Sequence, residues 1–340
     1  MAFPNERRKK LTKLWETITI RNITIKNRIV MAPMHCFSFE IKNGYHTQQY
    51  IDHYIARAKG GAGIIITAAT SVCPQVTHPG IWEDGQIPQM KQIADGCHKY
   101  GAKVIVQIIC KKGDENRLTT AKIRFIQEQY ISAAKRVSAS GADGLEIHCC
   151  HGSLMCRILS GETNFRSDSY GGTAGNRARI LTEMLPEMRK VVGNDFILSV
   201  RLGGNMPTIQ DGIQFAKILN KTDVDILDVS SGNISPTHQL PESYHGSLIS
   251  HLATLLKQHT NLPVIGVSEI FTANDANYFL ENDMFDLAAV GRGMFADDKW
   301  ATKALNGEII NQCHNCGKSR VHCHWFTDHT KCPARKKLTR

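Results

Sequence analysis

Short apolar runs rich in β-branched residues recur eight times in this chain, each followed by a loop and a longer amphipathic stretch. Nearly continuous apolar sequence of this length is typical of a strand that is covered on both faces. The runs cover residues 28–31, 64–67, 104–108, 144–148, 197–201, 226–230, 264–267 and 287–291. Helical periodicity lies between them, for example in residues 50–59, 127–140, 177–191, 212–219 and 248–258.

Eight β–α repeats predict a closed (β/α)8 TIM barrel, an α/β fold, and not an open doubly wound sheet. An open sheet would be favoured by a glycine-rich phosphate loop after the first strand, but the sequence there is Met-Ala-Pro-Met at residues 31–34. We expect the barrel to occupy residues 1–305, with a hairpin in residues 14–25 closing its floor. A short basic, Cys/His-rich tail over residues 306–340 follows it.

Composition narrows the class of protein. No apolar run reaches the roughly 18 residues that span a bilayer, and the start MAFPNERRKK leads into polar sequence. We therefore expect a cytoplasmic protein that does not insert into a membrane. The net charge of +10 is in part terminal, and we interpret it as solvated charge or as a field that attracts phosphate-bearing ligands. Without a basic stripe interleaved with aromatic residues, no nucleic acid partner is expected.

In a barrel of this kind, the chemical residues follow the C-terminal ends of the strands. Gln107, His148, His151 and Arg201 occupy such positions. A buried guanidinium such as that of Arg201 needs an anionic or carbonyl partner. The two histidines suit either a metal or the oxygen of a ligand, and we favour the oxygen because the pattern offers no third metal ligand nearby. The Gly-Arg-Gly turn at residues 291–293 is typical of a phosphate cradle.

Five stretches, in order along the chain, carry a specific resemblance. They read LWETITIRNITIKNRIVMAPM, YIARAKGGAGIIITAAT, GADGLEIHCCHGSLMCRILSGETNFRSDSYGGTAGNRARIL, DILDVSSGN and DLAAVGRGMFAD. In these stretches the chain resembles the old yellow enzyme family of FMN-dependent oxidoreductases, particularly its bacterial branch. The resemblance implies FMN as cofactor and NAD(P)H as electron donor. It also implies a small-molecule acceptor with an activated, enone-like double bond, and it leaves a homo-oligomer open.

The resemblance also implies a role for each matching position. His148 and His151 would be the catalytic pair, binding the acceptor's oxygen and polarising it for hydride attack, with Phe37 on the substrate side. The flavin ring would be contacted by Ala32, Pro33, Met34, His35, Ala69, Gln107 and Arg201. Its phosphate would be held by Ser268, Gly291 and Arg292, with backbone from Gly266.

Two departures from the family pattern affect the expected reaction. Ser153 stands where relatives carry a tyrosine proton donor, so solvent, a cysteine or Tyr170 would have to supply the proton. Residues 108–113 replace a His-Ala-Gly-Arg stretch, and Lys111 or Lys112 could take over from the lost arginine. The alternatives to enone reduction are flavin-dependent reduction of another acceptor and a low-activity flavin- or metal-binding scaffold.

The tail concentrates cysteines that no barrel strand requires. In larger relatives that resemble the dienoyl-CoA and trimethylamine-type flavoproteins, a cysteine cluster just past the barrel holds a [4Fe–4S] centre. Tetrahedral zinc fits the spacing equally, bound by all four thiolates or by three thiolates and one imidazole from His322, His324 or His329. Reduced thiols without any metal fit it as well. The candidate metal ligands are Cys313, Cys316, Cys323 and Cys332.

Overall fold

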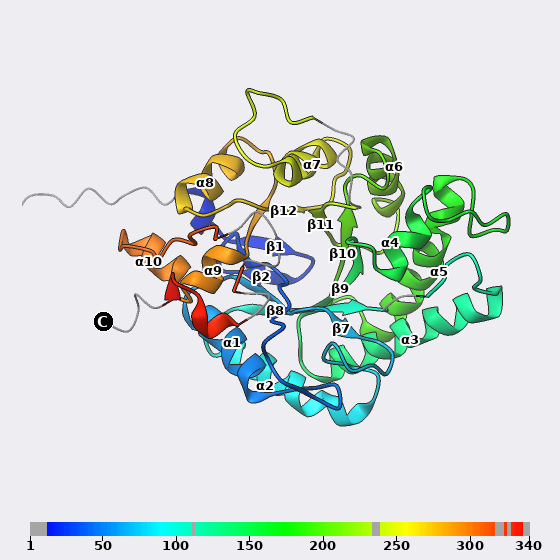
Figure 1. The fold of residues 1–340 in the computed structure, drawn as a ribbon, viewed down its shortest axis with the longest axis horizontal. Coiled ribbons are helices and arrows are strands. Elements are labelled where there is room, and N and C mark those ends of the chain that lie inside the picture. Colours follow the sequence, from blue (N-terminus) through cyan, green and yellow to red (C-terminus); the bar gives the residue numbers. More distant parts are fainter. Residues whose placement is uncertain (1–11, 111–112, 233–238, 317–322, 325–327, 336–340) are drawn as a thin grey trace, which may run out of the picture.

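Eight parallel strands close into a barrel at the centre of the molecule, as the sequence predicts (Figure 1). The computed structural model describes residues 12–110, 113–232, 239–316, 323–324 and 328–335. The strands pair in the order β6-β3-β13-β12-β11-β10-β9-β8, and pairing of β6 with β8 completes the circle. They are β3 (Ile29–Met31), β6 (Ile64–Ile66), β8 (Lys103–Ile109), β9 (Gly144–Cys149), β10 (Ile197–Gly203), β11 (Ile226–Ser230), β12 (Val264–Val267) and β13 (Leu287–Val290).

Helices surround the strands on the outside (Figure 1). They are α1 (Gln48–Lys59), α2 (Ile87–His98), α3 (Thr120–Ala139), α4 (Leu154–Leu159), α5 (Ala174–Val192), α6 (Ile209–Leu219), α7 (Leu248–Lys257), α8 (Ala273–Glu281), α9 (Arg292–Ala296) and α10 (Trp300–Asn306). Short additions are the antiparallel pair β4 (Ile41–Lys42) and β5 (Tyr45–His46), and β7 (Thr70–Ser71), which extends the sheet beside β8. In the part of the chain that the structure describes, no helix has the length and apolar character needed to cross a membrane.

The predicted floor hairpin is present as β1 (Ile18–Ile20) and β2 (Ile23–Ile25). Its side chains Ile20, Ile23 and Ile25 are buried and belong to one cluster with the inward-facing residues of the barrel strands. Those partners include Val30, Ile64, Ile66, Ile105, Ile197, Ile226, Ile265 and Leu287. The lower half of the barrel is therefore a packed apolar plug.

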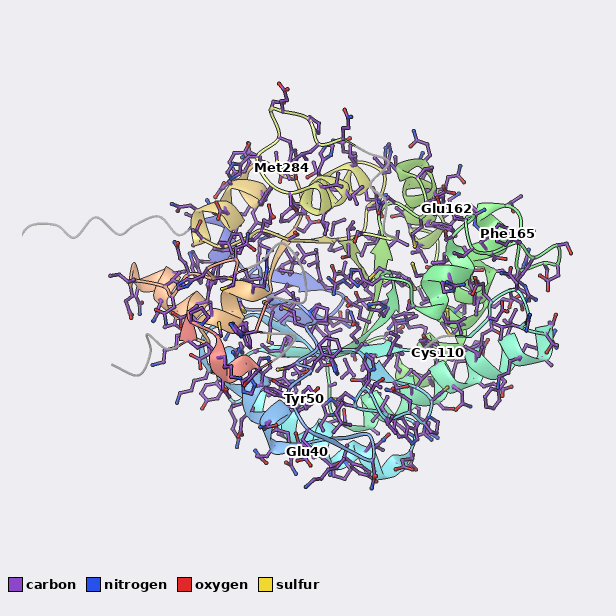
Figure 2. All side chains as sticks on the ribbon, in the orientation of Figure 1. Glu40, Tyr50, Cys110, Glu162, Phe165 and Met284 are labelled. Atoms are coloured by element: carbon purple, nitrogen blue, oxygen red, sulfur yellow. The ribbon has the colours of Figure 1, made fainter. Side chains whose placement is uncertain are left out.

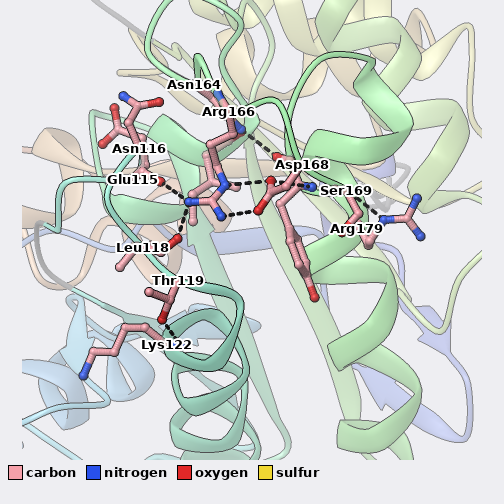
Figure 3. A network of polar contacts seen from close by, with 12 residues as sticks. Glu115, Asn116, Leu118, Thr119, Lys122, Asn164, Arg166, Asp168, Ser169 and Arg179 are labelled. Carbon is pink, nitrogen blue, oxygen red and sulfur yellow. Dashed lines mark hydrogen bonds and ion pairs between the residues drawn. The ribbon is translucent and has the colours of Figure 1, made fainter.

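The Asn-x-Arg-x-Asp stretch at residues 164–168 is a clamp between two loops at the mouth of the barrel (Figure 3). Arg166 Nη1 donates to the backbone oxygens of Glu115 at 2.8 Å and Leu118 at 2.5 Å, in the segment after β8. Its Nε donates to Asp168 Oδ1 at 3.0 Å. The buried Asn164 amide donates to backbone oxygens on both sides of its own loop. These contacts give the motif a structural role in holding loops, and they assign it no catalytic role.

Two tyrosines from the helix layer hold the ends of strands. The hydroxyl of Tyr54 on α1 accepts the N–H of Ala68 at 2.8 Å, just beyond β6. The hydroxyl of Tyr130 on α3 accepts the N–H of Cys110 at 2.7 Å, just beyond β8. Both tyrosines are buried, so no water can replace either bond.

Replacing Tyr54 or Tyr130 with phenylalanine leaves a buried N–H without an acceptor. We expect each variant to lose about 1–3 kcal/mol of unfolding free energy in urea denaturation. Tyr100→Phe, at a side chain that is 39% exposed, serves as the control and should change stability by less than about 0.5 kcal/mol. Losses no larger than that of the control would contradict the prediction.

Candidate functional site

A polar layer lies directly above the apolar plug, because alternate residues of four neighbouring strands point into the barrel. Gln107 Nε2 donates to Glu146 Oε1 at 2.8 Å, and Ser199 Oγ donates to Glu146 Oε2 at 3.0 Å. Arg201 and Asp228 are opposite each other in the register of β10 and β11. Their Nε and Oδ2 atoms are 3.3 Å apart. All five side chains are buried.

The ionisable groups of this layer shift each other's pKa values. Burial, reinforced by the Asp228 carboxylate, raises the pKa of Glu146 to about 8. Burial also raises the pKa of Asp228, against the attraction of Arg201. Among the described residues, neither Arg201 Nε nor the two Asp228 oxygens has an aligned hydrogen-bond partner. Arg201 thus has its anionic neighbour, as expected, but the pair lacks an aligned hydrogen bond.

His148 and His151 meet at the mouth above this layer, as predicted, with ring centroids 5.3 Å apart. His148 lies near the end of β9, opposite Arg201 in the neighbouring strand. Burial, together with the Arg201 charge, lowers the pKa of His148 to about 3, so its imidazole is neutral near pH 7. Its Nδ1 has no hydrogen-bond partner among the described residues. His151 Nε2 is 2.8 Å from Ser230 Oγ.

Our expectation that the histidine pair lacks a third metal donor was wrong. Cys150 Sγ lies 3.6 Å from His148 Nε2 and 3.4 Å from His151 Nδ1. The three donor atoms all lie within 4.8 Å of one another. Since side chains alternate along a strand, Cys150 shares the inward face with His148. The chain then turns at His151, which has a left-handed φ of 54°, and this turn returns the second imidazole to the same place.

The predicted flavin-contacting residues of the first loop follow β3 directly. The N–H of Ala32 donates to Val290 O at 3.1 Å, and Pro33 and Met34 continue the loop half-buried. The His35 ring lies 4.5 Å from Phe37 between centroids, and Phe37 is 57% exposed. The predicted substrate-side aromatic is therefore accessible from solvent.

The other predicted cofactor positions lie at the ends of neighbouring strands. Ala69 follows β6 and is almost fully buried. Ser268 follows β12 with a positive φ of 88°, and Gly291 follows β13 as the N-cap of α9. Because β12 and β13 are paired, these two ends are adjacent. Arg292 lies over the ring of Phe271 and donates to the side chain of Asn315 in the tail.

The tail returns to the barrel beside α9 (Figure 1). Arg335 Nη1 donates to Phe295 O at 3.0 Å, and His329 Nδ1 lies 2.6 Å from Ser38 Oγ in the loop after β3. One pocket is lined by Arg292 and by all four candidate metal ligands, Cys313, Cys316, Cys323 and Cys332. Burial raises the pKa of the Cys313 thiol, and the nearby Cys323 and Cys332 add to the effect. The structure thus places all four predicted ligands around one pocket.

Ser153, at the position of the usual tyrosine, and Tyr170, the expected alternative proton donor, both make hydrogen bonds within the scaffold. Ser153 Oγ donates to His148 O at 2.9 Å and accepts the N–H of Cys156 as the N-cap of α4. Tyr170 donates to Glu183 Oε2 at 2.7 Å, on the outer helix α5. Tyr170 as a proton donor at the mouth is therefore wrong. Lys111 and Lys112 lie outside the described residues.

Sequence reasoning missed a pair of thiols at the ends of β7 and β8. The two strands lie side by side, with Val72 N–H donating to Ile109 O at 3.0 Å. The Cys73 thiol is hydrogen-bonded to that of Cys110, which Figure 2 labels. This bond lowers the pKa of Cys73 to about 7 despite its partial burial. No spacing rule could have found the pair, because only the register of β7 against β8 joins the two residues.

Comparison with known proteins agrees with this geometry. The NADH:flavin oxidoreductase / NADH oxidase family matches residues 13–116 and 109–310. An NADPH dehydrogenase of Listeria monocytogenes serotype 4b is 31% identical over 332 residues, covering 88% of this chain and 97% of the relative. An NADH oxidase of Thermoanaerobacter brockii is 32% identical over 338 residues. The alignment covers 87% of this chain but only 52% of that protein, so the chain spans about half of its length.

Solved structures show the same fold. A 2-naphthoyl-CoA reductase matches with a TM-score of 0.80 and 25% identity, covering 89% of this chain and 54% of that one. Morphinone reductase matches with a TM-score of 0.75 and 20% identity, covering 94% and 96%. Since the family match spans most of the barrel, the chain belongs to the NADH:flavin oxidoreductase / NADH oxidase family, the family of the old yellow enzymes.

Proposed function

We propose that the protein is an FMN-dependent oxidoreductase that passes hydride from NAD(P)H to an unsaturated small molecule activated by an oxygen substituent. The observation that carries the proposal is the buried Arg201 guanidinium, which lies 3.3 Å from the Asp228 carboxyl group without an aligned hydrogen bond and directly opposite His148 in the neighbouring strand. A buried cationic donor in this state fits an anionic ring edge such as that of a reduced flavin. When bound, FMN would supply the hydride-transfer chemistry.

The chain's own residues would bind and orient the reactants. Gln107 and Arg201 would contact the flavin ring from the polar layer, and Gly291, Arg292 and Ser268 would hold its phosphate at the ends of β12 and β13. His148 and His151 would bind the acceptor's oxygen. Because His148 is neutral near pH 7, it would act as a hydrogen-bond donor and not as an acid.

The source of the proton narrows the reaction further. Ser153 caps a helix, and Tyr170 bonds to α5, so neither hydroxyl faces an acceptor at the mouth. The remaining candidate besides solvent is the Cys150 thiol between the two imidazoles, and burial raises its pKa well above the ordinary value, which makes it a poor acid. The proton that completes the reduction would therefore come from solvent. This favours acceptors whose oxygen carries the developing negative charge until water protonates the carbon.

Arg201→Met tests the flavin site. Losing a charge-assisted hydrogen bond of about 1.5–3 kcal/mol should raise the FMN dissociation constant roughly 10- to 100-fold, measured by fluorescence titration of flavin-stripped protein. Because the single variant leaves Asp228 unpaired, Arg201→Met/Asp228→Asn is the control for folding. It should regain thermal stability while FMN binding stays weak. Unchanged FMN affinity in both variants would rule out the assigned role.

His148→Asn tests the acceptor site. In anaerobic stopped-flow experiments, NADPH should still bleach the flavin absorbance, while its recovery with 2-cyclohexenone should slow about 100-fold, because one donor to the acceptor oxygen is altered. Ser153→Ala is the matched control next to it. It should lose about 1 kcal/mol of stability as a helix cap and keep the recovery rate. Equal recovery rates in His148→Asn and the wild type would refute the acceptor role.

For the tail we propose a metal centre held by Cys313, Cys316, Cys323 and Cys332, because four thiols around one pocket suit either a [4Fe–4S] cluster or zinc. Elemental analysis of anaerobically purified protein should find either iron with sulfide or zinc. Cys332→Ser should lower that content while the FMN content remains. Metal-free wild-type protein would leave the tail a purely structural element and refute the proposal.

A further inference from the structure

We propose that His148, Cys150 and His151 form a second, independent binding site for a thiophilic divalent cation such as Zn²⁺ or Cd²⁺. The site lies at the barrel mouth and not in the tail. It combines two imidazoles with one thiol, a donor set that zinc accepts with a fourth position left open for water. The three donor atoms come from four consecutive residues at the end of β9.

The spacing of the donors matches a tetrahedral ion. Zinc bonds of about 2.3 Å to sulfur and 2.0–2.1 Å to nitrogen, at a tetrahedral angle, place sulfur and nitrogen about 3.5 Å apart. The observed distances from Cys150 Sγ are 3.6 Å to His148 Nε2 and 3.4 Å to His151 Nδ1. The third pair of donors, the two imidazole nitrogens, lies within 4.8 Å.

The surroundings support metal binding in two further ways. His151 is held through its other nitrogen, Nε2, by Ser230 Oγ at 2.8 Å. A bond of this kind orients a metal-binding imidazole and sets which nitrogen carries the proton. Cys150 is fully buried, whereas His151 is exposed, so an ion can enter from the barrel mouth and reach a sulfur that bulk solvent does not.

The nearby charges can accommodate the ion. Binding breaks the Cys150 S–H bond, forms the sulfur–metal bond and releases the proton to solvent, which adds one net positive charge to the mouth. Arg201 opposes that charge, while the carboxyl group of Asp228 lies near Cys150 and favours it. The thiolate that forms also lies beside the Arg201 guanidinium.

The site has a functional consequence that rests on the proposed function. An ion bound here engages the two imidazoles that would otherwise bind the acceptor's oxygen. Zinc would then block reduction of the acceptor without displacing FMN, because none of the three metal ligands is assigned a contact to the flavin. The acceptor and the ion are therefore expected to compete.

Equilibrium dialysis of the full-length holoenzyme against Zn²⁺ tests the site directly. Cys150→Ala should lose one equivalent of bound zinc relative to the wild type, with affinity at this site reduced at least roughly 100-fold. Cys149→Ala is the matched control, because this neighbouring buried thiol faces the helix layer. It should retain the wild-type stoichiometry, and the tail contributes equally in all three proteins. Equal zinc uptake by Cys150→Ala and the wild type, or equal loss in both variants, would overturn the proposal.

Enzyme inhibition provides the second readout. Zinc should slow reoxidation of the NADPH-reduced wild type by 2-cyclohexenone at least tenfold and leave Cys150→Ala unaffected. Equal inhibition of the wild type and Cys150→Ala would contradict the expected competition between zinc and the acceptor. If the protein reduces no enone at all, the proposed function fails, while the dialysis result still decides whether the metal site exists.

Discussion

The buried ionisable groups of Arg201, Asp228 and Glu146 are the constraint on which the upper half of the barrel depends. Taking an ion pair out of water is seldom stabilising in itself, so the apolar plug and the helix layer must supply the folding free energy. Glu146 is satisfied by Gln107 and Ser199, whereas Arg201 and Asp228 touch without an aligned hydrogen bond. The fold thus carries an incompletely satisfied charge where a ligand can complete it.

The sequence predicted the barrel well because buried parallel strands and amphipathic helices leave different periodicities. All eight apolar runs overlap the eight barrel strands, and the floor hairpin lies where it was expected. The two-residue strands β4, β5 and β7 were missed. Segments this short have no periodic signal, and they exist only because neighbouring backbone offers hydrogen-bond partners.

The sequence predicted where the candidate site lies, but not which side chains contact each other within it. The rule that chemistry follows strand ends identified Gln107, His148 and Arg201, yet it could not show that Glu146 and Asp228 would be their partners. Tertiary register decides such contacts, and it also joins Cys73 to Cys110. For the Asn-x-Arg-x-Asp motif at residues 164–168, the sequence pattern was clear but its role was not. In the structure, Arg166 of this motif holds loops together.

Cys149 and Cys150 are neighbours in the sequence, but their side chains point to opposite faces of the strand and have different environments. Cys149 faces the helices and serves as a small apolar side chain, whereas Cys150 faces the mouth between two imidazoles. A neutral imidazole can donate through its N–H or coordinate through its lone pair, so the same two rings suit an acceptor's oxygen or a metal ion. The Cys150 thiol adds a third ligand for a metal ion, whereas an acceptor bound through its oxygen does not need it. Cys150 is therefore the residue that gives this mouth a second ligand chemistry.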